Sequence, residues 1–173
     1  KYSNSMREEW DLFVIKSNNG TIFNTRKFLN YHINRKFNDC SLCFYNNKDL
    51  VCVLPAAIDK ANKKIISHPG ASYGGLIINI KIKFSTMNKI INLLTNYCKK
   101  NNIASIFLIN SPSIYWTDYD ASLEYILEFN NFYSKEIYIS HASQLNQKKP
   151  IIDYLDKRKG RYIKKFIGNR YNK

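Results

Sequence analysis

The sequence predicts a mixed α/β fold, a twisted mixed sheet with helices on both faces. Two patterns support this fold class. Short apolar runs follow one another early in the chain, as in antiparallel hairpins. Later, strands alternate with amphipathic helices, as in the crossovers that make strands parallel. With 173 residues and 45% hydrophobic content the chain can bury one core, so we expect residues 1–156 to form a single domain.

The N-terminal part is expected to form two helices. Apolar residues recur at helical spacing from Met6 to Val14, and Asn18-Asn19-Gly20 is typical of a helix end. Residues 21–23 are predicted as a short extended piece. Thr25 can then cap a second helix that runs to about Asn34.

A hairpin is expected next. Residues 39–45 alternate between apolar and polar, residues 46–49 form a turn, and residues 50–54 are apolar on both faces. Cys40 and Cys43 have the spacing of a zinc knuckle, but the alternation of a strand turns their side chains to opposite faces. We therefore expect free buried thiols, no metal site and a reducing compartment.

The second half of the chain alternates strands with helices. Strands are predicted over residues 64–66, 76–82, 103–109 and 136–142, with helices over residues 85–101, 118–129 and from residue 151 onward. The first of these helices has the clearest pattern, because one apolar stripe runs along it. The stripe consists of Met87, Ile90, Ile91, Leu94 and Cys98.

Basic residues concentrate near the C-terminus. Residues 157–173 hold eight of them and no acid, which is more than half of the net charge of +14. This predicted helix, with Tyr162 and Phe166 among the cations, can meet phosphate, anionic lipid or an acidic protein surface. The chain shows no apolar run of transmembrane length and no signal peptide, so we expect a cytoplasmic protein without a transmembrane segment.

The stretch most typical of a binding site covers residues 67–76, Ser-His-Pro-Gly-Ala-Ser-Tyr-Gly-Gly-Leu, between two predicted strands. At a strand end, backbone N–H groups can face a ligand, and glycine permits a close approach. His68 is the candidate general base, since histidine ordinarily has a pKa near 6.5, and Tyr73 is the candidate proton donor. The alternative is that His68 caps a turn and Tyr73 packs on the sheet.

Six further residues are candidates for substrate binding. Those in the loop either contact the ligand or shape the backbone. The two aromatic ones fall in a predicted surface loop over residues 111–117, where they stack on a sugar or base or anchor the loop. The remaining histidines, His32 and His141, are assigned structural roles. The six candidates are Gly70, Ser72, Gly74, Gly75, Tyr115 and Trp116.

Three motifs carry a resemblance to a known family. They are Trp10-Asp11-Leu12-Phe13-Val14, then Phe23-Asn24-Thr25 followed by Phe28-Leu29, and above all Gly70-Ala71-Ser72-Tyr73-Gly74-Gly75-Leu76. Residues 8–110 resemble the N-terminal half of the Fem-type (FemAB-like) acyltransferases, a branch of the GNAT superfamily. The basic segment at residues 157–173 resembles the one that leads into the second half of these enzymes, and we expect the chain to stop where that half would begin.

The resemblance implies a GNAT-like sheet and transfer of an acyl or aminoacyl group to an amine. The donor would be an acyl-CoA, acetyl-CoA included, or an aminoacyl-tRNA, and the acceptor a small-molecule amine, a cell-wall precursor or a surface sugar. One family feature is missing, because no Arg/Gln-x-x-Gly-x-Gly/Ala loop joins a strand to a helix. Since Gly74-Gly75 leads into a strand, we expect the 67–76 loop to face the acceptor.

Three functions therefore stay open. The first is an acyltransferase, or the acceptor-binding half of one. The second is a nucleic-acid-binding module that holds tRNA through the basic tail. The third is a non-catalytic scaffold that self-associates, or pairs with a second half or chain, through apolar residues of the last helix such as Leu155 and Phe166.

Overall fold

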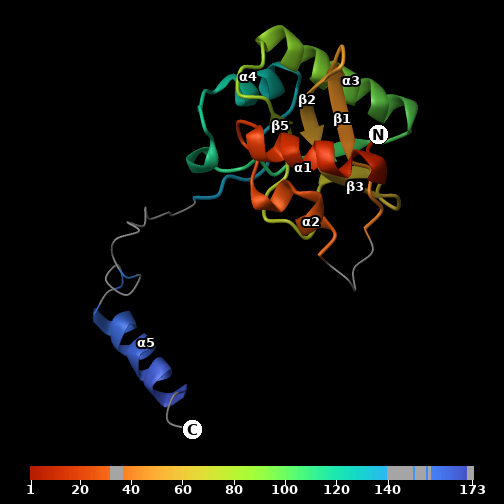
Figure 1. Cartoon of the computed structure of the whole chain (residues 1–173). Helices are drawn as coiled ribbons and strands as arrows, with labels where there is room; N and C mark the ends of the chain where they lie inside the picture. The colour runs from red at the N-terminus through yellow and green to blue at the C-terminus, as the bar shows by residue number, and fades with distance from the viewer. Residues whose placement is uncertain (32–36, 140–149, 151–154, 156, 171–173) are drawn as a thin grey trace. The chain divides into compact units, whose positions relative to one another are not determined.

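The computed structural model describes residues 1–31, 37–139, 150, 155 and 157–170. The protein contains both α and β structure, and the chain divides into two compact units, Lys1–Ile137 and Tyr138–Lys173. Figure 1 shows the elements of the first unit. Its described helices are α1 (Arg7–Lys16), α2 (Arg26–Leu29), α3 (Phe84–Lys100) and α4 (Ser122–Phe129), and its strands are β1 (Leu42–Asn46), β2 (Asp49–Leu54), β3 (Ala56–Asp59), β4 (Lys64–Ser67), β5 (Ile77–Ile78) and β6 (Ser105–Phe107).

The described strands form two three-stranded sheets instead of the single sheet that the sequence predicts. In the first, of order β1-β2-β5, all neighbours are antiparallel. In the second, of order β3-β4-β6, β3 and β4 are antiparallel and β4 and β6 are parallel. Pro55 separates β2 from β3, and because proline has no N–H to donate, it interrupts the ladder there. The mixed fold class is confirmed, and the single sheet is wrong.

Two hydrophobic clusters cover opposite faces of the first sheet. Cys52 and Leu54 of β2 pack in the larger cluster with α3 and α4, whereas Val53 packs with Trp10 of α1. Figure 1 shows β1 and β2 lying between α1 and α3. The strand alternation of β2 therefore gives this sheet a helix on each face, as the sequence predicts.

The elements with the strongest apolar pattern agree best with the sequence. The α1 helix ends at Lys16, just before its predicted stop, and Thr25 caps α2 by accepting a hydrogen bond of 3.2 Å from the Phe28 N–H. The second helix is shorter than predicted, because α2 ends at Leu29 with Asn30 as its C-cap and does not run to about Asn34. His32 and His141 lie outside the described residues. The whole predicted stripe of α3 is buried: Met87, Ile90, Ile91, Leu94 and Cys98.

Several local predictions are wrong. Of the predicted extended residues 21–23, only Thr21 is extended, because Ile22–Asn24 is a 3₁₀ turn (η2). The α4 helix begins at Ser122, about one turn later than predicted. The strand expected from residue 76 is reduced to the two residues of β5. Residues 136–139 belong to no strand, and residues 140–142 of that predicted strand lie outside the described part.

The four cysteines are free thiols. Cys40 packs in the larger cluster and Cys43 against the smaller one, which confirms that the two side chains point to opposite faces. Burial raises the pKa of the Cys40 thiol to about 12 and that of Cys43 to about 11. Within the described residues, no three His, Cys, Asp or Glu side chains come together as a metal site.

The second unit contains helix α5 (Lys157–Arg170), which is described here by itself. Half of its 14 residues are Lys or Arg, and none is acidic. The side chains from Arg161 to Lys165 are exposed, including Tyr162 and Ile163. The predicted basic helix is therefore confirmed from Lys157 to Arg170, whereas Leu155, which was expected in the same helix, lies outside it.

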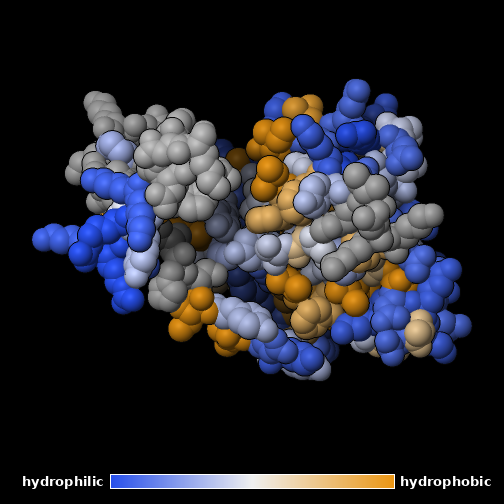
Figure 2. All heavy atoms as spheres, turned by 90° about the horizontal axis from the view of Figure 1, so that it is seen from below, coloured by the Kyte–Doolittle hydropathy of each residue, from blue (hydrophilic) through white to orange (hydrophobic). Residues whose placement is uncertain are grey.

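Large hydrophobic side chains also reach the surface of the first unit. Figure 2 shows them on one face of the molecule in separate groups, between hydrophilic residues. Ile22, Ile114 and Tyr115 are each more than half exposed. None of the described helices is both long and apolar enough for a membrane crossing.

Candidate functional site

The 67–76 loop begins at the carboxyl end of a parallel strand pair. The β4 strand ends at Ser67, and its parallel neighbour β6 ends at Phe107. Two hydrogen bonds join the loop to the chain that leaves β6. The Ile109 N–H donates to Ser67 Oγ at 2.6 Å, and the Gly74 N–H donates to the Ile109 carbonyl at 2.7 Å. Ligand sites of α/β proteins commonly lie at such strand ends, where the loops converge.

Glycine is required at two positions of this loop. Gly75 has a φ of 70°, and a Cβ at this position would lie 2.4 Å from Oδ1 of Asn110. A Cβ at Gly74 would lie 2.7 Å from the Ser67 Cβ. Both contacts are too short for a side chain, so the bare backbone allows the loop to pack directly on the ends of β4 and β6.

His68 is buried, with 4% of its surface exposed. Its Nδ1 lies 2.9 Å from the Pro69 carbonyl oxygen, and its ring meets Phe37 edge-on at 5.2 Å between centroids. Its backbone N–H donates to the Pro55 carbonyl at 3.1 Å. These contacts shape the turn that follows β4, and they favour the structural role of His68 over that of a solvent-accessible base.

Tyr73 belongs to a group of aromatic rings from three distant segments. Its ring centroid lies 5.5 Å from that of Phe23 in an edge-on contact, and 5.9 Å from that of Tyr115. The Asn24 side-chain amide also donates to the Tyr73 carbonyl at 3.4 Å. The loop is thereby joined to η2 on one side and to the segment after β6 on the other.

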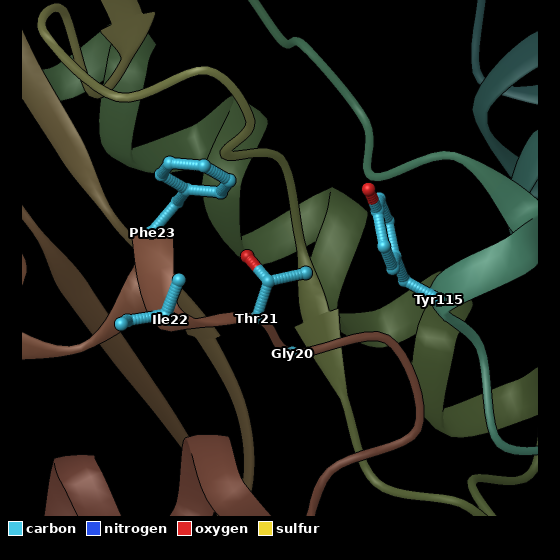
Figure 3. A pocket seen from close by; sticks show the side chains of 5 residues that line it. All are labelled: Gly20, Thr21, Ile22, Phe23 and Tyr115. Carbon is cyan, nitrogen blue, oxygen red and sulfur yellow. The ribbon is translucent and has the colours of Figure 1, made fainter. Parts of the chain in front are cut away.

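Two of these rings line a surface pocket of about 380 Å³. Its other lining residues are Gly20, Thr21 and Ile22, and Figure 3 shows Tyr115 facing this segment across the pocket. No lining residue is charged. The hydroxyl groups of Thr21 and Tyr115 provide polar contacts beside the apolar faces of Ile22 and Phe23. The pocket therefore suits an uncharged moiety that has an apolar face and a few hydroxyl groups.

The remaining predicted binding residues differ in exposure and in whether they line the pocket. Tyr115 is 51% exposed and lines the pocket, whereas Trp116 is 9% exposed and donates from Nε1 to the Ser111 carbonyl at 3.1 Å. Of the two roles left open by the sequence, Trp116 therefore has that of a loop anchor. Gly70 and Ser72 are exposed, and no pocket contact is recorded for them.

Two buried polar atoms lie beside the glycine loop without a hydrogen-bond partner. They are Oδ1 of Asn110, which packs against Gly75, and Oγ of Ser111. Buried polar atoms are rarely left unbonded, because each costs the free energy of its lost contact with water. The chain after β6 therefore has spare hydrogen-bonding capacity where it meets the loop.

Sequence analysis missed the wall formed by Gly20–Phe23, since a helix end and an extended piece predict no site. The available signal was the motif Phe23-Asn24-Thr25. Asn24 is fully buried, and its side-chain oxygen accepts hydrogen bonds from the N–H and hydroxyl of Thr21, which closes η2. A buried asparagine in a turn commonly sets the local backbone shape.

Comparison of this chain with models of protein families, with curated proteins and with solved structures finds no match. The geometry of the site and the resemblance of the motifs are therefore the observations that bear on the function of this chain.

Proposed function

We propose that this chain is an N-acyltransferase of the GNAT superfamily, or the acceptor-binding half of one, and that its aromatic pocket holds the acceptor. One observation carries the proposal. Tyr73 of the glycine loop meets Phe23 and Tyr115, and both of these line the pocket. The loop that carries the strongest resemblance to the Fem-type enzymes therefore contacts two of the residues that line the pocket, although none of its own residues lines it.

Two features of the fold support this proposal, although they belong to different sheets. A GNAT-like domain needs one mixed sheet with helices on both faces, and here the mixed pairing lies in the second sheet, where β4 is antiparallel to β3 and parallel to β6. The α1 and α3 helices cover opposite faces of the first sheet. The proposed acceptor is an amine carried on an uncharged, hydroxylated group such as an amino sugar, because the pocket lining has aromatic faces, hydroxyls and no charge.

Within the proposal, Tyr73 and Tyr115 act on the acceptor and His68 maintains the turn. The buried ring of His68 contacts Phe37 and the Pro69 carbonyl, so it is poorly placed to deprotonate an ammonium in the pocket. Tyr73 has a hydroxyl and a partly exposed side chain, and it can hydrogen-bond the acceptor. The acyl-CoA or aminoacyl-tRNA is assigned to a second half, since Gly74-Gly75 leads into β5 and not into a helix.

A transfer assay tests the proposal. Acyl-CoAs and aminoacyl-tRNAs are offered with amino sugars and cell-wall precursors, and products are detected by mass spectrometry, with acceptor binding measured separately by thermal shift. Tyr115→Ala should weaken acceptor binding about fivefold, since loss of one aromatic stacking contact is worth about 1 kcal/mol. Tyr133→Ala is the matched control, because Tyr133 is 83% exposed.

The results separate the two versions of the proposal. Transfer supports a complete enzyme. Acceptor binding without transfer, lost in Tyr115→Ala and kept in Tyr133→Ala, supports an acceptor-binding half. If no acceptor shifts the melting temperature and no product forms with any donor, the proposal is wrong.

A second candidate function has one specific observation in its favour. At 100° per residue, five cations of α5 fall on one arc of about 120°, where they can follow a phosphate backbone. RNA affinity should then fall with salt at a log–log slope of about −3 to −4, since each phosphate contact contributes about −0.7. Deleting residues 157–173 should abolish the binding, and binding that survives the deletion would exclude this function. The five cations are Lys157, Arg158, Arg161, Lys164 and Lys165.

A further inference from the structure

Two neighbouring asparagines at the end of α1 are almost completely buried. Asn18 is 4% exposed and Asn19 is 1% exposed, although both follow a helix end and precede Gly20 in a turn. Asparagine is mostly found at protein surfaces, and a buried amide is tolerated when its donors and acceptor are bonded. Both side chains meet this condition: the partners of Asn19 lie at β5, and those of Asn18 lie in the segment that follows Tyr115.

Asn19 binds the outer edge of β5. Its Nδ2 donates to the Leu76 carbonyl at 2.8 Å, and its Oδ1 accepts from the Ile78 N–H at 2.9 Å. The side-chain amide thus takes the place of a peptide group from a neighbouring strand. Leu76 is the last residue of the glycine loop, so this bond fixes where the loop ends.

Asn18 binds the segment that follows Tyr115. Its Nδ2 donates to the Asp118 carbonyl and its Oδ1 accepts from the Asp118 N–H, both at 2.8 Å. Its own carbonyl accepts from the Thr117 N–H at 2.8 Å, and its N–H donates to the Ile78 carbonyl at the same distance. One residue therefore bonds β5 and the segment beside the pocket at the same time.

We propose that Asn18 and Asn19 are positioning residues that set the separation between Tyr115 and the wall formed by Gly20–Phe23. Gly20, the first residue of one wall, directly follows the pair. Thr117, which is bonded to Asn18, lies two residues after Tyr115 in the other wall. Figure 3 shows these two walls facing each other. The proposal builds on the proposed acceptor pocket, but it concerns the geometry of the pocket and needs no substrate to be tested.

Asn18→Asp is the most selective test. An aspartate keeps the oxygen that accepts from the Asp118 N–H, and it replaces the Nδ2 donor by an oxygen that faces the Asp118 carbonyl. We expect amide exchange at Thr117 and Asp118 to accelerate at least tenfold, and the nuclear Overhauser contact between the Tyr73 and Tyr115 rings to disappear. The rings are 5.9 Å apart between centroids in the native protein, close enough for that contact.

Ile91→Val is the matched control. Ile91 is 1% exposed in the larger cluster, on α3, and loss of one methylene weakens the core without touching either asparagine. If Asn18 contributed only to overall stability, Asn18→Asp and Ile91→Val would change amide exchange and the ring contact in the same way. We expect Ile91→Val to keep the ring contact and the relative protection of Thr117 and Asp118.

The native protein provides a measurement that does not depend on either variant folding. Thr117 and Asp118 have exposed side chains, and hydrogen bonds to Asn18 account for both of their amides. Slow exchange of these two amides supports the proposal, and exchange as fast as in an unstructured peptide overturns it. An unchanged ring contact in a folded Asn18→Asp protein also overturns it. Because no substrate is present, either result leaves the test of acyl transfer unaffected.

Discussion

The Lys1–Ile137 unit and helix α5 are stabilised by different kinds of interaction. In the first unit, buried side chains pack together and make internal hydrogen bonds. An example is Trp10, whose Nε1 donates to the Asn24 carbonyl at 2.9 Å. In α5, the exposed Tyr162 and Ile163 lie among cations. Three cations in the first turn also oppose the helix dipole. The geometry of the first unit therefore depends on internal contacts, whereas the described side chains of α5 are mostly exposed and basic.

The largest contrast should come from removing one aromatic side chain in each region. Trp10 is 0% exposed, so Trp10→Ala should lower the free energy of unfolding by about 3–5 kcal/mol through the cavity and the lost hydrogen bond. Tyr162→Ala removes a side chain that is 63% exposed and should change the free energy of unfolding by less than about 0.5 kcal/mol. Urea unfolding measures this free energy for each variant, and equal losses of stability would contradict the comparison.

Glycine-to-alanine substitution should have opposite signs in the two regions. Gly75→Ala introduces a Cβ at a φ of 70° and 2.4 Å from Asn110 Oδ1, which should cost about 1–3 kcal/mol of stability. Gly160→Ala places the best helix former inside α5 and should favour its helix by about 0.5–1 kcal/mol. Thermal unfolding reports the first change and far-ultraviolet circular dichroism the second. A neutral Gly75→Ala would show that the loop can move away from Asn110.

Acid should weaken the first unit by a route that α5 lacks. Burial alone would raise the pKa of the Asp39 carboxyl, but hydrogen bonds from Ser41 and the ion pair with Arg26 outweigh it and lower the pKa below its ordinary value near 3.8. The stabilisation is therefore complete above about pH 4 and is lost as the pH falls through the lowered pKa. Asp39→Asn should flatten the dependence of stability on pH below 4, and an unchanged acid limb would contradict this assignment.

Salt should produce the smallest of these effects, and it should favour the folded form of α5, whereas acid weakens the first unit. Arg161 has a cation three or four residues away on both sides, and each like-charged pair costs a few tenths of a kcal/mol. Raising sodium chloride from about 0.05 to 0.5 M screens these pairs and should increase the helicity of α5 slightly. Comparison of circular dichroism with and without residues 157–173 isolates this part of the signal. A decrease in its helicity with salt would contradict the repulsion argument.

The sequence predicts the described fold best for elements that depend only on the spacing of apolar residues along the chain. The stripe of α3 from Met87 to Cys98 and the hairpin of β1 and β2 need only local pattern and burial, and both are observed. Pro55 stands between the two sheets, and its missing N–H leaves a gap in a ladder that resumes at the bridge between Asp39 and Ala57. The apolar pattern of the sequence does not show this gap. An apolar run predicts that a strand exists and does not predict its neighbour.

The candidate site was predicted in part, for the same reason. The 67–76 loop can be recognised in the sequence because glycine is unfavourable inside a strand and typical of a loop. The wall from Gly20 to Phe23 and the roles of Asn18 and Asn19 depend on bonds to Leu76, Ile78 and Asp118, between 57 and 100 residues away. The sequence leaves Trp116 with two roles, ligand contact or loop anchor, because a short loop between polar residues does not reveal that its indole donates to the carbonyl of Ser111.

The amide of Asn19 has a further consequence for the behaviour of this protein in concentrated solution. In an open sheet, an outer strand presents unpaired N–H and C=O groups on which another chain can assemble, the first step of β-aggregation. At β5 these groups already bond Asn18 and Asn19. A foreign strand must displace both asparagines before it can pair with this edge, so two buried side chains protect it from uncontrolled growth of the sheet.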